Sequence, residues 1–252
     1  MKRQLLLIST RRDEASVNIA KSLLDHKIWE TIPGLNSPPV EQLIPTVIYE
    51  SGVSAGNDND VILASSTRRG DLVYLWLQDS PLLCLNEADR LFSQKLISYS
   101  PILAENPPMI DEIIFLSKHS AKSGVRSLTV HPIGIPHTKN IDIAGGWAGR
   151  CVPPSRRIFA LYRKLLAETK MVGLDEKYQI TLEATHHGPF ANVPTCFVEI
   201  GSTENDWGEE DAGWIWAKIL IDHLEIILPA ESPSAAVAEM DILNEMRFSR
   251  PN

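Results

Sequence analysis

Short apolar runs alternate along this chain with amphipathic segments of helical periodicity, and this alternation restricts the possible folds more than any other feature. The run at residues 5–8 predicts a buried strand, and the helical segment at 15–24 follows it directly. Further strands are predicted at residues 46–49, 61–65, 72–77, 111–117, 127–130, 178–184 and 196–200. Further helices are predicted at 87–97, 155–171 and 209–227, with a smaller one after Pro233. The pattern indicates a three-layer α/β/α domain with a mixed, mostly parallel sheet and a central first strand.

One domain is expected to span the whole chain, residues 1–252. The composition is that of an ordinary globular protein, with 44% hydrophobic and 22% charged residues, and no Gly/Ser-rich or charged linker divides it. The segments 29–45 and 132–154 are rich in loop-forming residues, and 229–252 is expected to be a helical C-terminal extension. The glycines and prolines of the second segment indicate an ordered functional loop.

The charge balance argues against two classes of partner. With 24 basic and 32 acidic residues, the net charge is −8, which disfavours non-specific binding to DNA and to anionic membranes. No stretch approaches the roughly 18 apolar residues that a transmembrane helix needs. The three cysteines, Cys84, Cys151 and Cys196, form no Cys-x-x-Cys pair. We therefore expect a cytoplasmic protein with reduced thiols.

Two adjacent histidines follow the strand predicted at 178–184, where Gly188 begins a turn. Open α/β sheets bind ligands beyond the carboxyl ends of their strands. His186 and His187 could therefore ligate a metal, act as a general base or stabilise a developing oxyanion. A pair of surface histidines at a turn is the alternative, and the neighbouring Glu183 and Thr185 favour the functional interpretation.

Two other strands end near ionisable residues. Glu199 interrupts an otherwise apolar strand and needs a partner if it is buried; a purely structural hydrogen bond is the alternative to a catalytic role. His131 follows the strand at 127–130, and the prolines and glycine after it, including Gly134, would hold it rigidly. A zinc site of mixed His/carboxylate type could draw on His131, His186, His187 and either Glu183 or Glu199.

The strand at 196–200 leads through Gly201 into a predicted helix start. Ser202 or Thr203 is a good N-cap, and free backbone N–H groups at such a start can bind an anion. A cap without a ligand is the alternative interpretation. The three tryptophans nearby, Trp207, Trp214 and Trp216, are expected in the core rather than on a base-stacking surface.

Common nucleotide and hydrolase motifs are absent from the sequence. It contains no Gly-x-x-x-x-Gly-Lys-Ser/Thr, Gly-x-Ser-x-Gly, Gly-x-Gly-x-x-Gly or His-Glu-x-x-His pattern. Their absence argues against a P-loop nucleotidase, an α/β-hydrolase, a Rossmann dehydrogenase and a helix-borne metalloprotease.

Four motifs, in order and in register, resemble those of the archaeal and plant type of D-aminoacyl-tRNA deacylase. They are DEIIFLSKHS at 111–120, SLTVHPIG at 127–134, LEATHHGP at 182–189 and FVEIGSTE at 197–204. The resemblance is good from about residue 110 to 225 and fair at 4–26. The family pattern continues into a Gly-Gly-Gly-His-Tyr run that this sequence lacks before Asn252, so we expect a C-terminally shortened or diverged member.

The resemblance implies hydrolysis of the ester that joins a D-amino acid to the 3′-terminal ribose of tRNA. It also implies zinc and a fold akin to peptidyl-tRNA hydrolases and nucleoside phosphorylases. An activated water would attack the acyl carbon, with His187 as the base and Glu199 orienting it. The expected catalytic residues are His186, His187, Glu199, Thr185 and His131. The expected substrate-binding residues are Gly201, Ser202, Thr203, His119 and Gly134, and the expected metal ligands are His186, His187 and Glu183.

Two other functions stay open from the sequence. One is a diverged enzyme on the same fold that acts on a small ester, thioester or amide instead of tRNA, in a cleft that is not basic. The other is a binding protein without catalysis, which would tolerate His186→Ala. The sequence carries no signal for the acyl group or the oligomeric state.

Overall fold

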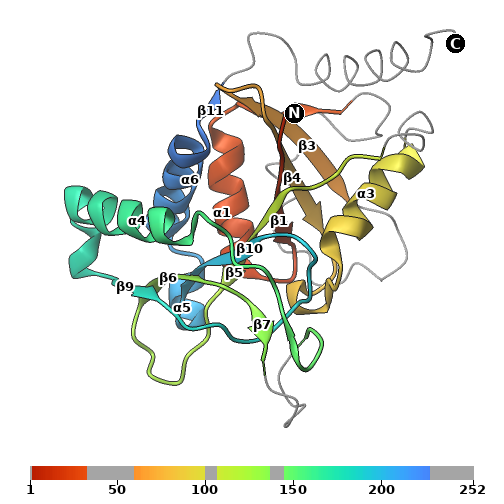
Figure 1. The fold of residues 1–252 in the computed structure, drawn as a ribbon. Helices are drawn as coiled ribbons and strands as arrows, with labels where there is room; N and C mark the ends of the chain where they lie inside the picture. The colour runs from red at the N-terminus through yellow and green to blue at the C-terminus, as the bar shows by residue number, and fades with distance from the viewer. Residues whose placement is uncertain (1, 33–59, 100–106, 137–144, 228–252) are drawn as a thin grey trace, which may run out of the picture.

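The fold is described by a computed structural model for residues 2–32, 60–99, 107–136 and 145–227 (Figure 1). The predicted strand at 46–49, the helix after Pro233 and the extension at 229–252 lie outside the described residues. Within these ranges, no helix combines the length and the hydropathy that crossing a membrane demands.

A sheet of nine strands runs through the described part of the chain. Its strands are β1 (Gln4–Thr10), β2 (Glu30–Thr31), β3 (Val61–Thr67), β4 (Leu72–Gln78), β5 (Glu112–Lys118), β6 (Ser127–His131), β9 (Gln179–Leu182), β10 (Thr195–Gly201) and β11 (Ile226–Ile227). Their order is β11-β3-β4-β1-β5-β10-β6-β9, and β2 pairs with β3. The four strands β4, β1, β5 and β10 are parallel, whereas β6 runs antiparallel to β10. The first strand is therefore central, and the sheet is mixed, as predicted.

Helices cover both faces of this sheet (Figure 1). The three helices α1 (Glu14–Asp25), α4 (Ile158–Val172) and α6 (Glu210–Leu224) pack on one face, and α3 (Ala88–Tyr99) packs on the other. Strand β1 is buried along its whole length because Leu5 and Leu7 face the first group while Leu6 and Ile8 face α3. The three-layer prediction is confirmed. Shorter elements are η1 (Leu82–Cys84), β7 (Gly134–Ile135), β8 (Arg150–Cys151), η3 (Leu174–Glu176) and α5 (Glu204–Trp207).

Ser155 is predicted to cap the helix that ends near residue 171, but the N-cap of α4 is Arg157 and the helix begins at Ile158. The backbone N–H of Ser155 donates to the carbonyl of Thr195, so this residue joins the start of β10 instead of capping the helix. Its hydroxyl donates to the buried carboxylate of Glu112, which also pairs with Arg157 Nε at 2.8 Å. A buried polar network thus replaces the predicted cap.

Helix α6 ends at Leu224, earlier than predicted. The next residue, Glu225, has a left-handed backbone, and residues 226–227 join the sheet edge as β11. Near this end, an Arg157 guanidinium nitrogen lies 3.5 Å from His223 Nε2. Burial and this guanidinium lower the pKa of His223 from 6.5 to about 4, so the folded protein holds this imidazole neutral.

Stability is therefore expected to fall as the pH drops from 7 to 5, because the unfolded chain takes up the His223 proton more readily. The contribution is about 1 kcal/mol, since solvent reaches this half-buried side chain and screens part of the effect. His223→Gln keeps an acceptor for Arg157 and removes the titration, so this share of the pH dependence should vanish. Urea unfolding of both proteins at pH 5 and pH 7 measures it, and identical pH dependence would contradict the assignment.

Candidate active site

The ionisable residues gather on the face of the sheet that points away from α1, α4 and α6. Alternation along each strand places Glu199 of β10 and Thr129 and His131 of β6 on this face, because their neighbours on these strands pack against the helices. The parallel pairing of β6 with β9 sets Thr181 opposite Thr129, and Glu183 follows two residues later. The site thus lies over the antiparallel β10–β6 pair rather than only beyond the strand ends.

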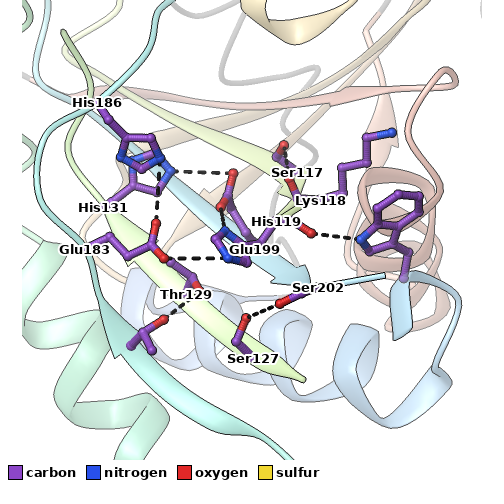
Figure 2. A network of polar contacts seen from close by, with 12 residues as sticks. Ser117, Lys118, His119, Ser127, Thr129, His131, Glu183, His186, Glu199 and Ser202 are labelled. Carbon is purple, nitrogen blue, oxygen red and sulfur yellow. Dashed lines mark hydrogen bonds and ion pairs between the residues drawn. The ribbon is translucent and has the colours of Figure 1, made fainter. Parts of the chain in front are cut away.

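Glu199 is the centre of the cluster, and its side chain is nearly inaccessible (Figure 2). Its Oε2 lies 3.4 Å from His119 Nδ1, and its Oε1 lies 3.5 Å from His131 Nε2. Glu183 completes the network, with its Oε1 3.7 Å from His119 Nε2 and its Oε2 3.6 Å from His186 Nε2. The sequence predicts that this carboxylate needs a partner if it is buried, and the structure provides two, His119 and His131.

The charges of the cluster favour an ionised Glu199. Burial alone would raise its pKa, but the contacts with His119 and His131 outweigh this and hold the pKa at about 2. The bond to Glu199 raises the pKa of His119, and the same carboxylate raises that of His131 despite its burial. Burial, followed by repulsion from His131, lowers the pKa of His187 to about 4. The site therefore combines a carboxylate, two histidines that favour the charged form and one neutral histidine.

Three histidines lie against one another beside this network: His131 ends β6, and His186 and His187 are neighbours on the turn after β9. The ring of His131 is 4.2 Å from that of His186 and 4.9 Å from that of His187, between centroids. Each Nδ1 contacts a backbone carbonyl. His131 Nδ1 lies 3.0 Å from the carbonyl oxygen of Pro132, His186 Nδ1 lies 2.8 Å from that of Ala184, and His187 Nδ1 lies 2.5 Å from that of Gly188. An Nδ1–H bound in this way leaves Nε2 as the ring nitrogen that can face a carboxylate or bind a metal.

This arrangement fits a zinc site. Ligand atoms of His131, His186 and His187 all lie within 4.8 Å of one another, and the buried Nε2 of His131 makes no hydrogen bond within the described part of the chain. Zinc-binding histidines usually donate their other N–H to a carbonyl or carboxylate, as these do. Glu183, expected as the third ligand, belongs instead to a neighbouring group with His119 and Glu199, whose ligand atoms meet the same distance limit.

Glu199 forms no direct ion pair with His187, the base that it was expected to orient. The ion-pair partners of Glu199 are His119 and His131, whereas His187 Nδ1 contacts the carbonyl of Gly188. His187 lies on the turn after β9, whereas His131 reaches Glu199 from the adjacent strand β6.

The expected anion site after β10 is already filled by a side chain of the protein. Thr203 caps α5, as predicted, but the backbone N–H groups of Ser202 and Thr203 both donate to Asp206 Oδ2, each at 2.9 Å. They are therefore not free to hold an oxyanion in this conformation. Gly201 lies against His119, and a Cβ atom there would come within 2.7 Å of that side chain.

The remaining predicted residues lie close to the histidines. The N–H of Gly134 donates to the carbonyl of His187 at 2.8 Å, so this glycine supports the histidine turn. Thr185 is exposed on the same turn, and its side chain makes no hydrogen bond among the contacts of the described ranges.

Two supporting residues were not assigned to the site from the sequence. Asp13 caps α1 by accepting from Ser16 N at 3.0 Å, and it also accepts from Lys118 N at 2.9 Å. Trp207 donates its Nε1–H to the carbonyl of His119 at 2.9 Å. Both fix the end of β5, from which His119 extends. The N-cap position of Asp13 was a usable signal, whereas the contact of Trp207 was not visible in the sequence.

Of the three tryptophans expected in the core, only Trp216 is fully buried. Trp207 is half-buried under the Lys118 ammonium, which lies 4.3 Å from its ring centroid. Trp214 is 43% exposed on the outer side of α6, so the core prediction is wrong for this residue.

Comparison with known proteins identifies the family. The sequence profile described as D-aminoacyl-tRNA deacylase matches residues 107–238, just over half of the chain. The chain belongs to the D-aminoacyl-tRNA deacylase family. The matched segment of this family member contains all the ionisable residues of the cluster described above.

Named relatives agree with this assignment. A D-aminoacyl-tRNA deacylase of Arabidopsis thaliana is 46% identical over 118 residues, which are 46% of this chain and 37% of the relative. One from Aeropyrum pernix is 39% identical over 130 residues, or 51% of this chain and 46% of the relative. The match to this family member thus spans less than half the length of these relatives.

A solved structure supports the fold. The crystal structure of a conserved protein of unknown function superimposes with a TM-score of 0.61 and 24% identity, covering 88% of this chain and 63% of the other. The likeness to peptidyl-tRNA hydrolases and nucleoside phosphorylases stays a prediction.

Proposed function

We propose that this protein hydrolyses the ester between a D-amino acid and the 3′-terminal ribose of tRNA. Membership of the deacylase family supports this substrate, and the buried Glu199 that joins His119 and His131 is the observation that carries the chemistry. Burying a carboxylate between two histidines gains little net stability, because the cost of desolvation offsets much of the attraction. Its burial therefore favours a functional role. The named relatives are deacylases, and the matched segment includes the complete cluster.

Zinc is the proposed cofactor, with His131, His186 and His187 as the residues that would hold it. When bound at such a site, zinc lowers the pKa of a bound water and polarises a carbonyl oxygen. The carbonyls that accept from each Nδ1 orient the three rings for this purpose.

The partly exposed residues of the cluster are proposed to contact the substrate. Glu199 holds His119 through Nδ1, so the other ring nitrogen, Nε2, is available as a donor to the acyl oxygen as negative charge develops there. Glu183 lies between His119 and His186 and is proposed to accept a proton from the attacking water. The water oxygen bonds to the acyl carbon, the ester bond breaks, and Glu183 returns the proton to the departing ribose oxygen.

The test is hydrolysis of D-Tyr-tRNA by the purified protein, beside L-Tyr-tRNA, with and without a chelator. Selective release of D-tyrosine is expected, with kcat/KM at least a hundredfold lower in His119→Ala and His186→Ala, the range that loss of a proton-transfer or oxyanion group produces.

His26→Ala is the matched control, because this exposed histidine follows α1 outside the cluster. It should retain wild-type activity. The proposal is overturned if folded protein supplied with zinc releases no D-tyrosine, or if the His119 and His186 variants match the His26 control.

A further inference from the structure

A stacked aromatic pair lies beside the histidine cluster and has no role in the chemistry above. The rings of Trp147 and Phe190 are nearly parallel, with centroids 4.5 Å apart and planes inclined by 15°. Phe190 is buried, whereas the indole is 41% exposed. The pair therefore presents a flat aromatic surface to solvent, backed by a second ring.

The aromatic pair is held close to the histidines by tight backbone packing. Phe190 comes three residues after His187, a distance of at most about 11 Å along the chain. A Cβ atom added at Gly188 would lie 2.2 Å from the backbone nitrogen of Gly146, the residue before Trp147. The two loops thus approach each other more closely than any side chain permits, which fixes the indole relative to the histidine turn.

The same loop supplies a cation. Arg150 follows on β8, and its guanidinium carbon lies 5.8 Å from the Phe190 ring centroid. Its backbone is anchored by pairing with Ile135 and by donation to the carbonyl of Trp147 at 3.0 Å. The side chain is exposed and has no carboxylate partner among the ion pairs of the described residues. A positive charge therefore borders the aromatic surface in a chain whose net charge is −8.

We propose that Trp147 and Arg150 bind the terminal nucleotide of the substrate, with the purine base stacked on the indole and its 5′-phosphate against the guanidinium. This inference rests on the proposed function and assigns the nucleotide side of the same site. Base stacking on an aromatic ring and pairing of Arg with phosphate are the usual means of holding a single-stranded end. The ribose that carries the ester also carries this base, so anchoring the base positions the acyl carbon near the histidines. An uncharged amino-acid side chain could stack on the indole of Trp147 equally well, but it would form no ion pair with Arg150.

The test compares two esters of D-tyrosine, one with adenosine 5′-monophosphate through its ribose and one with ethanol. In Trp147→Ala, the KM of the nucleotide ester should rise about tenfold relative to that of the ethyl ester. Trp147→Phe, which retains an aromatic ring on Phe190, should restore most of the difference. Arg150→Gln should raise the KM of the nucleotide ester but not that of an adenosine ester without phosphate.

Trp214→Ala is the matched control, because this tryptophan is equally exposed, at 43%, on α6. It should leave the KM values unchanged. Equal rises of KM for both esters in Trp147→Ala would mean that the indole contacts the acyl side chain, and this would overturn the proposal, as would no change for either ester.

Binding of adenosine 5′-monophosphate alone separates this inference from the proposed function. Titration followed by the NMR signals of the indole N–H groups should show binding to the wild type, weakened about tenfold in Trp147→Ala and in Arg150→Gln. If the wild type binds the nucleotide in this way but hydrolyses no ester, the deacylase proposal fails and the nucleotide site stands. If it hydrolyses D-Tyr-tRNA but the variants bind and react like the wild type, only the nucleotide site fails.

Discussion

Glu199→Gln is expected to lower kcat/KM for D-Tyr-tRNA at least a hundredfold. Glutamine has nearly the same shape but no charge, so it cannot hold His119 in its charged form. The bond that raises the pKa of His119 is lost, and His119 is no longer fixed as a donor toward the acyl oxygen. Stability should also fall, by about 3 kcal/mol, because one partner of a buried charged group has been removed. Steady-state kinetics and urea unfolding measure the two effects.

Glu112→Gln is the control for this experiment. Like Glu199, Glu112 is a buried carboxylate in an ion pair, here with Arg157. It lies at the opposite end of β5 from His119. Its glutamine variant should lose stability while kcat/KM stays close to the wild-type value. If Glu199→Gln instead retains activity within about threefold, the network around this carboxylate is structural and the proposed chemistry is wrong.

His131→Gln is expected to release zinc and abolish activity. The imidazole is completely buried, and its Nδ1 is held by the carbonyl of Pro132, so Nε2 is the nitrogen directed at the proposed metal. A glutamine amide is a poor zinc ligand compared with an imidazole. Zinc content after dialysis at a fixed free-metal concentration should fall from about one ion per chain in the wild type to less than a tenth of that.

His223→Gln serves as the comparison, because it removes a half-buried histidine that belongs to neither group of possible ligands in the described residues. It should retain its zinc. Circular dichroism shows whether the His131 variant is folded when its metal is measured. A wild type that binds no zinc, or a His131 variant that binds as much as the wild type, would remove zinc from the proposal.

The layers of the fold could be predicted from the sequence because the pattern of apolar residues within each short segment shows which segments are buried. Runs such as 5–8 and 72–77 are short and apolar at every position, as expected for strands that are covered on both faces. The ends of α4 and α6 were predicted less well. Ser155 joins β10 and residues 226–227 join β3, and such pairings depend on segments distant in sequence.

The candidate site was predicted in composition but not in geometry. The buried glutamate and His131 were found because ionisable residues in apolar strands are conspicuous, and the adjacent histidines were found because they follow a predicted strand at a glycine turn. The pairing of Glu199 was not, because it depends on β6 running antiparallel to β10. Asp206 was also missed, although Thr203-x-x-Asp206 has the spacing of a capping box, in which the acidic side chain satisfies the N–H groups expected to bind an anion.

The register between β6 and β10 ties the chemistry of this protein to its folding. Thr129 lies opposite Glu199, and a slip of β6 by one residue would turn His131 toward the helices and bring Val130 to the carboxylate. Such a sheet would bury an unpaired histidine among apolar side chains and leave Glu199 facing a valine. Both changes raise the free energy of the misaligned state, so the active-site residues themselves help select the native alignment of the strands.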